Sequence, residues 1–186
     1  MRSPVVRSLV SLSAAALVVS TARASLADHY RVPSGSMEPT VHVGDHIVVS
    51  KLAYGVRLPV TERYLVRFSA PERGDVVVLE PPEPIPGLGA VLLKRVVARS
   101  GETVAVRDGH VWIDGHEVAE RWASVAEGGG PDFGPSRVPD GHVLVLGDNR
   151  GNSRDGRSFG FVPVGHVLGR AEAVVARDGR PVVRGL

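Results

Sequence analysis

Short runs of β-branched and other apolar residues, separated by turn-forming residues, make up most of the chain after residue 25. Runs of this length and composition are typical of β-strands rather than helices. They fall at 46–50, 75–79, 90–98, 102–107, 110–113, 142–146 and 169–177. The pattern therefore predicts a mainly β protein built on a coiled antiparallel sheet.

Three Asp-Gly pairs mark expected hairpin turns. Asp108-Gly109 and Asp114-Gly115 separate short apolar runs by two residues, which is the strongest local signal for a hairpin. They predict a meander over 102–118, and Asp178-Gly179 predicts a further hairpin. Two segments rich in proline and glycine, 81–89 and 127–135, are expected to be exposed loops.

The first 25 residues differ in pattern from the rest. Arg2 and Arg7 precede 15 uncharged, largely apolar residues at 8–22, and Arg23 follows them. A helix of that length spans about 22 Å, short of the roughly 30 Å hydrocarbon core of a bilayer. Two interpretations remain: a hydrophobic helix that stays as an anchor, with its arginines reaching the interfaces, or a secretory signal removed at Ala22-Arg23-Ala24. In both, the residues that follow lie outside the cytoplasm.

Composition limits the number of domains, the partners and the chemistry that the chain can have. The 186 residues are 43% hydrophobic and 23% charged and show no internal repeat, so we expect a membrane segment at 1–25 and a single β-rich domain at 26–186. A net charge of +2 without a basic patch argues against nucleic acid as a partner. The chain has no cysteine and no metal-ligand spacing, so neither a thiol nucleophile, a metal nor another cofactor is expected.

A serine with a lysine as its base is the most persuasive candidate chemistry. Ser36 follows the turn-forming residues Pro33-Ser34-Gly35, and Lys94 lies in an apolar run. An ordinary lysine, with a pKa of about 10.4, is neutral in only about one molecule in two thousand at pH 7. Desolvation among apolar residues lowers that pKa and makes the amine a usable base. The seven histidines leave a Ser/His/Asp triad open, with Asp28-His29 and His142 as candidates.

Four sequence blocks, in this order, carry a resemblance to a known family. They are Ser34-Gly35-Ser36-Met37, Arg73-Gly74-Asp75-Val76, Lys94-Arg95-Val96-Val97 and Gly147-Asp148-Asn149-Arg150. The chain resembles the bacterial type I signal peptidases, Ser/Lys peptidases of family S26, from about residue 30 to 167. The resemblance implies an S26-like β-sheet peptidase domain preceded by one N-terminal hydrophobic helix.

The same resemblance assigns roles to individual residues. It implies that Ser36 is the nucleophile, that Lys94 is the general base, and that the Ser34 hydroxyl and the Ser36 amide form the oxyanion hole. It gives Ser153 the role of orienting the lysine. Asp148, Arg150, Asp155 and Arg157 are expected to brace the site as a network of ion pairs.

Other positions depart from the family's usual residues. Leu92 stands where an aromatic residue is common, Glu38 where a hydrophobic one is, Gly151 where an acidic one is, and Gly156 where a serine is. These departures leave the expected catalytic residues intact, but they affect the shape of the pocket and the bracing of the loop.

Substrate contacts follow from position along the chain. The residues that flank the expected site, and could line apolar pockets for small side chains, are Val32, Pro33, Met37, Leu92 and Leu93. Ordinary core packing would explain the same residues. An extended substrate could also pair with an edge strand at 90–94.

The sequence thus predicts a membrane-bound serine endopeptidase that removes signal peptides from exported preproteins with small residues at the cleavage site. The expected location is the cytoplasmic (inner) membrane, with a single span, a lipid bilayer as partner and the catalytic domain on the extracytoplasmic side. Two alternatives stay open: a processing peptidase dedicated to one precursor, such as a pilin-like or conjugative-transfer protein, and a catalytically silent domain that binds extended peptides.

Overall fold

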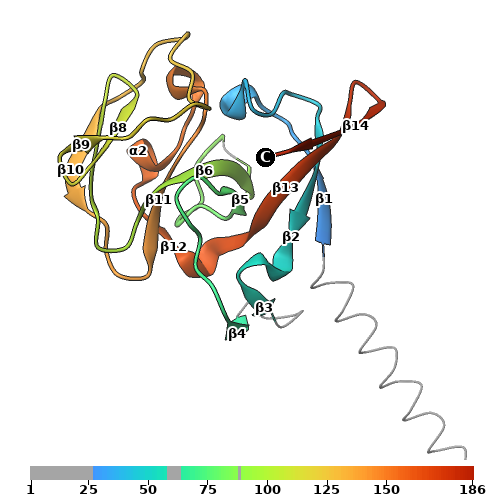
Figure 1. Cartoon of the computed structure of the whole chain (residues 1–186), viewed down its shortest axis with the longest axis horizontal. Helices are drawn as coiled ribbons and strands as arrows, with labels where there is room; N and C mark the ends of the chain where they lie inside the picture. The colour runs from blue at the N-terminus through green and yellow to red at the C-terminus, as the bar shows by residue number, and fades with distance from the viewer. Residues whose placement is uncertain (1–26, 58–63, 88) are drawn as a thin grey trace, which may run out of the picture.

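A curled antiparallel sheet forms the centre of the molecule. The computed structural model describes residues 27–57, 64–87 and 89–186 (Figure 1). The strands of the large sheet follow the order β1-β2-β13-β5-β6-β11-β12, with β14 paired to β13, and every pairing is antiparallel. Their bounds are β1 Ala27–Arg31, β2 His46–Ser50, β5 Val76–Leu79, β6 Leu92–Arg99, β11 His142–Leu146, β12 Val162–Pro163, β13 Val167–Arg177 and β14 Arg180–Gly185.

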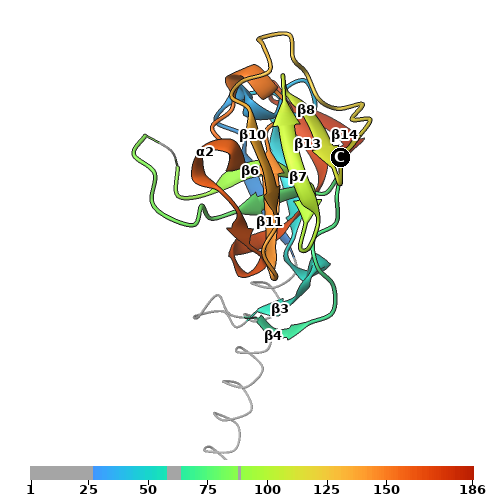
Figure 2. The ribbon, with the colours of Figure 1, turned by 90° about the vertical axis from the view of Figure 1, so that its left-hand side faces the viewer.

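A second sheet stacks beside the β6–β11 end of the first (Figure 2). Its strands follow the order β10-β7-β8-β9, with bounds β7 Thr103–Arg107, β8 His110–Ile113, β9 His116–Glu117 and β10 Phe133–Arg137. Asp108 and Asp114 have φ values of 48° and 50°, and the glycine after each is also left-handed. Positive φ at both central residues is the geometry of a two-residue hairpin turn, so the predicted meander is confirmed.

The remaining elements are short. Strands β3 Gly55–Arg57 and β4 Tyr64–Arg67 form a separate two-stranded sheet. The helices of the described residues are four single 3₁₀ turns and one α-helical turn: η1 Gly35–Met37, η2 Lys51–Ala53, η3 Arg150–Asn152, η4 Val164–His166 and α2 Gly156–Phe159. Within the described ranges no helix is long and apolar enough to cross a membrane.

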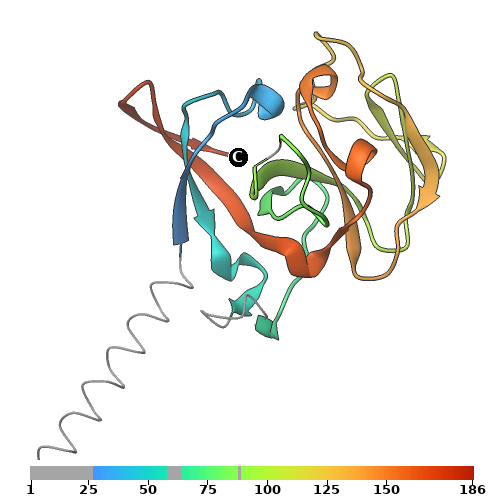
Figure 3. The same ribbon diagram turned by 180° about the vertical axis from the view of Figure 1, so that it is seen from behind.

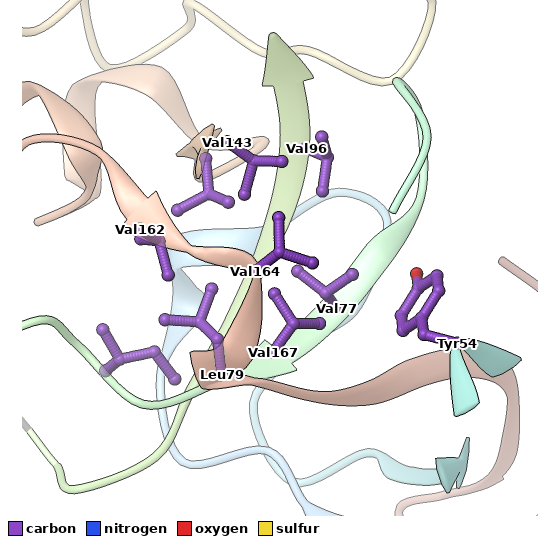
Figure 4. Close-up of a cluster of buried hydrophobic side chains, with 10 residues drawn as sticks. Tyr54, Val77, Leu79, Val96, Val143, Val162, Val164 and Val167 are labelled. Atoms are coloured by element: carbon purple, nitrogen blue, oxygen red, sulfur yellow. The ribbon is translucent and has the colours of Figure 1, made fainter. Parts of the chain in front are cut away.

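Three clusters of buried side chains, rich in valine, hold the sheets together. The first gathers Tyr54, Leu79, Val96 and Val167 with neighbours from β5, β11 and β12 (Figure 4). The second packs residues of β2, β5 and β13 against Met37 of η1, and the third fills the space between β6, β11 and the second sheet. Each fully buried valine stabilises the fold by about 1.5 kcal/mol or more, so the elements that carry the site are firmly placed.

The predicted strands are all present, with small changes at their ends. β2, β8 and β11 have the predicted bounds, and the hairpin at Asp178-Gly179 joins β13 to β14. The prediction that 127–135 is wholly loop was wrong, because β10 begins at Phe133 and pairs with β7 through Phe133 and Val106. The expected N-terminal helix lies outside the described residues. The described part is therefore mainly β with a curled antiparallel sheet, as predicted.

Candidate active site

The turn that follows β1 places Ser36 at the surface of the core. η1 begins directly after Ser34, whose backbone is extended. Met37, which follows Ser36, is buried in the second core cluster. The carbonyl of Ser36 accepts a hydrogen bond from the Asn149 amide at 3.1 Å, which ties η1 to the loop after β11. η1 thus lies between β6 and η3 (Figure 3). Ser36 is only 9% exposed.

Lys94 reaches Ser36 from the middle of β6. Its Nζ donates a hydrogen bond of 2.6 Å to Ser36 Oγ, across 58 residues of sequence. Side chains alternate along a strand, so Lys94 shares its face with Leu92 and Val96, both in the first core cluster. Lys94 is 4% exposed. The structure therefore brings together the two residues that the sequence nominated as nucleophile and base.

Burial changes the protonation of this lysine. Desolvation lowers the pKa of Lys94 from 10.5 to about 8, and the carboxylates of Asp155 and Asp148 oppose that fall without reversing it. No carboxylate of the described ranges forms an ion pair with Lys94 Nζ. At pH 7 the neutral fraction rises from roughly one in three thousand to roughly one in ten. Lys94 can therefore accept a proton from Ser36 near neutral pH.

Ser34 lies beside the nucleophile. Its Oγ is 3.5 Å from Ser36 Oγ, and its side chain is exposed toward the cleft described below. Gly35 separates the two serines, and the added Cβ of any larger residue would meet the Glu38 carboxyl at 3.3–3.5 Å. The place of Ser34 suits a second donor to an oxyanion at Ser36, and that role stays a prediction.

Ser153 lies behind the pair, next to Gly147. Its hydroxyl is buried and has no hydrogen-bond partner in the described part of the chain. Gly147 is tightly enclosed, because an added Cβ would collide with the Ser153 hydroxyl and the Ser36 carbonyl. No hydrogen bond joins Ser153 to Lys94 here, so its lysine-orienting role also stays a prediction.

Of the four residues expected to brace the site, Asp148 and Arg150 pair with residues outside the predicted set. Asp148 accepts two hydrogen bonds from Arg95, from Nε at 2.8 Å and from Nη2 at 2.7 Å. Arg150 pairs with Glu120 at 2.8 Å rather than with either expected aspartate. Arg95 stands in one of the quoted sequence blocks and could have been found, whereas nothing in the sequence marks Glu120.

Asp155 and Arg157 form the remaining ion pair. Arg157 Nε lies 2.9 Å from Asp155 Oδ1, and Asp155 also accepts hydrogen bonds from the Arg157 and Gly147 amides. Arg157 Nη2 donates to the Arg150 carbonyl at 2.7 Å. These bonds fix the loop from Gly147 to α2, which contacts η1.

Two glycines of this loop explain its departures from the usual family residues. An added Cβ at Gly151 would collide with the Glu127 carbonyl, and one at Gly156 would lie 2.7 Å from Leu144 Cδ1. Both positions leave no room for a side chain. Close packing therefore surrounds the loop at both of these glycines.

A cleft of about 480 Å³ opens at Ser36 and Lys94. All five predicted substrate-binding residues line it: Val32, Pro33, Met37, Leu92 and Leu93. Val32, Met37 and Leu92 are also buried core residues, and a role of the five in binding substrate stays a prediction. The cleft is also lined by Val91, within the edge strand expected at 90–94, and by four residues that the sequence did not single out: Gly87, Gly89, Asn152 and Arg154.

The histidines do not reach the serine. Ser36 Oγ is hydrogen-bonded to Lys94 Nζ and lies near Ser34 Oγ. His29 stacks on His46, and His142 Nδ1 contacts the Asp140 carbonyl. The geometry thus favours lysine over the histidine triad that the sequence left open. In the ranges described, no three His, Asp or Glu residues gather as metal ligands.

Comparison with known proteins agrees with this geometry. The family model described as "Signal peptidase, peptidase S26" matches residues 5–176. The chain belongs to this family. Membership makes it a serine endopeptidase of the signal peptidase type, as the sequence blocks predicted.

Signal peptidases of several organisms are similar to it. Signal peptidase I of Leptolyngbya laminosa is 34% identical over 91% of this chain and 78% of its own length. Probable signal peptidase I-1 of a Synechocystis strain is 38% identical over 75% of this chain and 66% of its own. A crystal structure of a signal peptidase I from Enterococcus faecalis is 35% identical, with a TM-score of 0.43 over 55% of this chain and 97% of that chain.

Proposed function

We propose that this signal peptidase removes signal peptides from exported preproteins through a Ser36–Lys94 dyad. The observation that carries the mechanism is the hydrogen bond of 2.6 Å between Lys94 Nζ and Ser36 Oγ in a buried, apolar setting. The burial of Lys94 lowers its pKa to about 8, which suits a general base near neutral pH. The family match over residues 5–176 supports the substrate class.

The chemistry divides into two proton-balanced steps. Neutral Lys94 takes the proton of Ser36 as Oγ attacks the scissile carbonyl, and it then gives that proton to the leaving amine. The signal peptide remains as an ester on Ser36. Lys94 next takes a proton from water, the hydroxide attacks the ester, and the proton returns to Ser36 Oγ as the carboxylate leaves.

The developing negative charge needs donors that are in place beforehand. The Ser36 amide and the Ser34 hydroxyl are the proposed donors, because Ser34 Oγ lies 3.5 Å from the attacking oxygen. Such a donor typically lowers the reaction barrier by about 3–4 kcal/mol. Ser153, the proposed lysine-orienting residue, has a buried hydroxyl without a hydrogen-bond partner among the described residues, next to Gly147 and near the Ser36 carbonyl.

The substrate is proposed to lie extended along β6. Leu92 to Lys94 pair with β5 on one side, while the pairing of β11 with β6 starts at Arg95. The second edge of β6 beside the cleft therefore lacks a strand partner in the described part, and an extended peptide can pair with it. Val32 and Leu92 give the shallow walls an apolar surface that suits small side chains before the scissile bond.

We further propose that residues 1–25 anchor a single catalytic domain, residues 26–186, in the cytoplasmic membrane, with the domain on the extracytoplasmic side. β1 starts at Ala27 and is tied to η2 by the ion pair of Asp28 and Lys51 at 2.6 Å. The β3–β4 hairpin that follows η2 carries exposed Leu65 and Val66, and Phe68 just after it is 62% exposed. Apolar surface beside the start of β1 supports a lipid bilayer as partner.

The test is the cleavage of a preprotein with an Ala-x-Ala site by the detergent-solubilised full chain, with product masses measured. We expect one cut after the second alanine by the wild type, and a loss of at least a thousandfold in Ser36→Ala. A fluorophosphonate-type label should react with Ser36 only in the wild type. No cleavage by a folded wild-type chain, or near-normal turnover by Ser36→Ala, would overturn the proposal.

A further inference from the structure

One arginine beside the cleft differs from the others that surround the site. Arg95, Arg150 and Arg157 are each paired with a carboxylate, at distances of 2.7–2.9 Å. Arg154 is exposed and forms no ion pair with any described carboxylate. The one hydrogen bond that it makes there is from Nη1 to the Pro86 carbonyl, at 3.0 Å. Its Nε and Nη2 donors are therefore available to a ligand.

Arg154 lies between two hollows of the surface. Arg154 lines the catalytic cleft together with Ser36 and Lys94, and it also lines a second hollow of about 390 Å³ formed by Pro82–Pro86, Ser158 and Phe159. It thus stands where the two hollows adjoin. A peptide that leaves the catalytic cleft toward the second hollow must pass its guanidinium.

The charge of the cleft selects the kind of ligand. Arg154 and Lys94 are the ionisable residues among those that line it, and no Asp or Glu is among them. The acidic residue of the second hollow, Glu83, is exposed and does not pair with Arg154. A guanidinium with free donors binds a carboxylate through charge-assisted hydrogen bonds. The cleft side of Arg154 therefore suits an acidic side chain.

The residues that line the cleft suggest where that side chain lies relative to the scissile bond. The residues before the bond are proposed to pack on Val32 and Leu92 and to pair with the edge of β6. Arg154 lies between η3 and α2, away from Val32 and β6 along the chain, and it lines both the cleft and the second hollow. The residues after the bond, the start of the mature protein, are left to reach it.

We propose that Arg154 is a specificity-determining residue that favours preproteins with a Glu or Asp among the first three residues of the mature protein. This inference rests on the proposed function, because it concerns substrates of the Ser36–Lys94 site. The pair would form at an exposed position, so its effect is a preference between substrates and not a requirement.

Competition between two substrates in one reaction tests this directly. Model preproteins carry Glu, Gln or Lys at the first, second or third residue after the cut, and product masses give the ratio of kcat/KM values. We expect the wild type to favour Glu over Gln by roughly three- to tenfold at one of these positions. The ratio should fall as salt is raised, because an exposed ion pair is screened.

Charge variants of Arg154 sharpen the test. We expect Arg154→Gln to remove the preference for Glu, Arg154→Lys to keep part of it, and Arg154→Glu to favour Lys over Gln. Arg180→Gln, on the exposed strand β14, is the matched control and should keep the wild-type ratio. An arginine that only tethers Pro86 would change the cleavage of all three substrates equally, and that result would overturn the inference.

The two proposals fail in different ways. Equal cleavage of Glu and Gln substrates by an active wild type would overturn the role of Arg154 and leave the Ser36–Lys94 mechanism standing. No cleavage of any substrate by the folded wild type would overturn the proposed function, and the role of Arg154 with it.

Discussion

Two neighbouring cations on β6 meet opposite surroundings. Lys94 and Arg95 are both 4% exposed, and they point to opposite faces of the strand. On one face, Lys94 lies with Leu92 and Val96 and donates a hydrogen bond to the neutral Ser36 hydroxyl. On the other face, Arg95 makes two hydrogen bonds to Asp148, donates to the Gly74 carbonyl at 2.6 Å and lies 4.5 Å from the Trp122 ring centre.

The difference shows that partners, and not burial alone, decide what a buried cation does. A buried charge with a matched carboxylate and satisfied donors stays charged and fixes two segments together. A buried amine without a carboxylate has a lowered pKa and becomes a base. Arg95 therefore holds two segments of the site together, whereas Lys94 has the properties that the proposed mechanism needs in a base.

The largest expected effect comes from removing the base. Lys94→Met keeps the length and apolar character of the side chain but cannot accept a proton. We expect kcat/KM to fall by at least about a thousandfold, because an unassisted serine hydroxyl is a poor nucleophile. Cleavage of the Ala-x-Ala preprotein measures the loss. A variant with more than a tenth of wild-type activity would show that another group takes the proton.

Replacing Arg95 should lower the stability of the fold instead. Arg95→Met leaves Asp148 buried without its partner, and we expect the free energy of unfolding to fall by about 3–5 kcal/mol. Urea unfolding measures the change. The double variant Arg95→Met/Asp148→Asn removes the charge as well and should recover part of the loss. A loss below about 1 kcal/mol in the single variant would mean that the pair does not hold the site together.

The same lysine change that stops cleavage should stabilise the protein. At pH 7 both the folded and the unfolded lysine are mostly protonated, and the fall in pKa from 10.5 to about 8 corresponds to a cost of about 3 kcal/mol. Lys94→Met removes that cost. The gain should be full below pH 8 and should shrink between pH 8 and 10.5, where the folded lysine has lost its proton and the unfolded one has not.

Unfolding curves of wild type and Lys94→Met at pH 7, 9 and 10 check this dependence. Lys51→Met serves as the control, because Lys51 is paired with Asp28 near the surface. A gain that does not change with pH would assign the stabilisation to packing and not to the amine.

The smallest expected effect is at Ser153, the proposed positioning residue. Ser153→Ala should lower kcat by roughly tenfold, since a less well-placed amine reaches Ser36 in fewer molecules. The readout specific to positioning is the pH profile of kcat/KM, whose midpoint near pH 8 should move, together with partial rescue by Ser153→Thr. An unmoved midpoint and an unchanged kcat would remove Ser153 from the account.

Much of this fold could be predicted from the sequence because its signals are local. Asp108-Gly109 and Asp114-Gly115 specify turns, and the valine-rich runs at 76–79 and 142–146 are buried strands. β12, only Val162–Pro163, has no local signal and exists because it pairs with His142 and Val143. β10 was missed for the same reason: its Gly-Pro sequence indicates a loop, and its pairing with β7 decides otherwise.

Some residues of the candidate site could also be identified from local sequence, and others could not. Ser36 and Lys94 could be named from residue types in their sequence blocks, and the structure places them in contact. The partners of the bracing residues could not, because Glu120 meets Arg150 only through the folded loop. Arg154 was missed because an isolated exposed arginine has no sequence signal, and its place between two hollows exists only in three dimensions.

The central claim is that the lowered pKa of Lys94 gives it a usable neutral fraction near physiological pH, and the titration of Lys94 tests this most directly. The chain has two lysines, Lys51 and Lys94, so a protein labelled only in its lysine side chains gives two NMR signals. Lys51→Arg assigns them. The account predicts that the Lys94 amine titrates with a midpoint at about 8. A Lys94 midpoint at its ordinary value of 10.5 would contradict the account, because the amine would then be charged at the pH of the reaction.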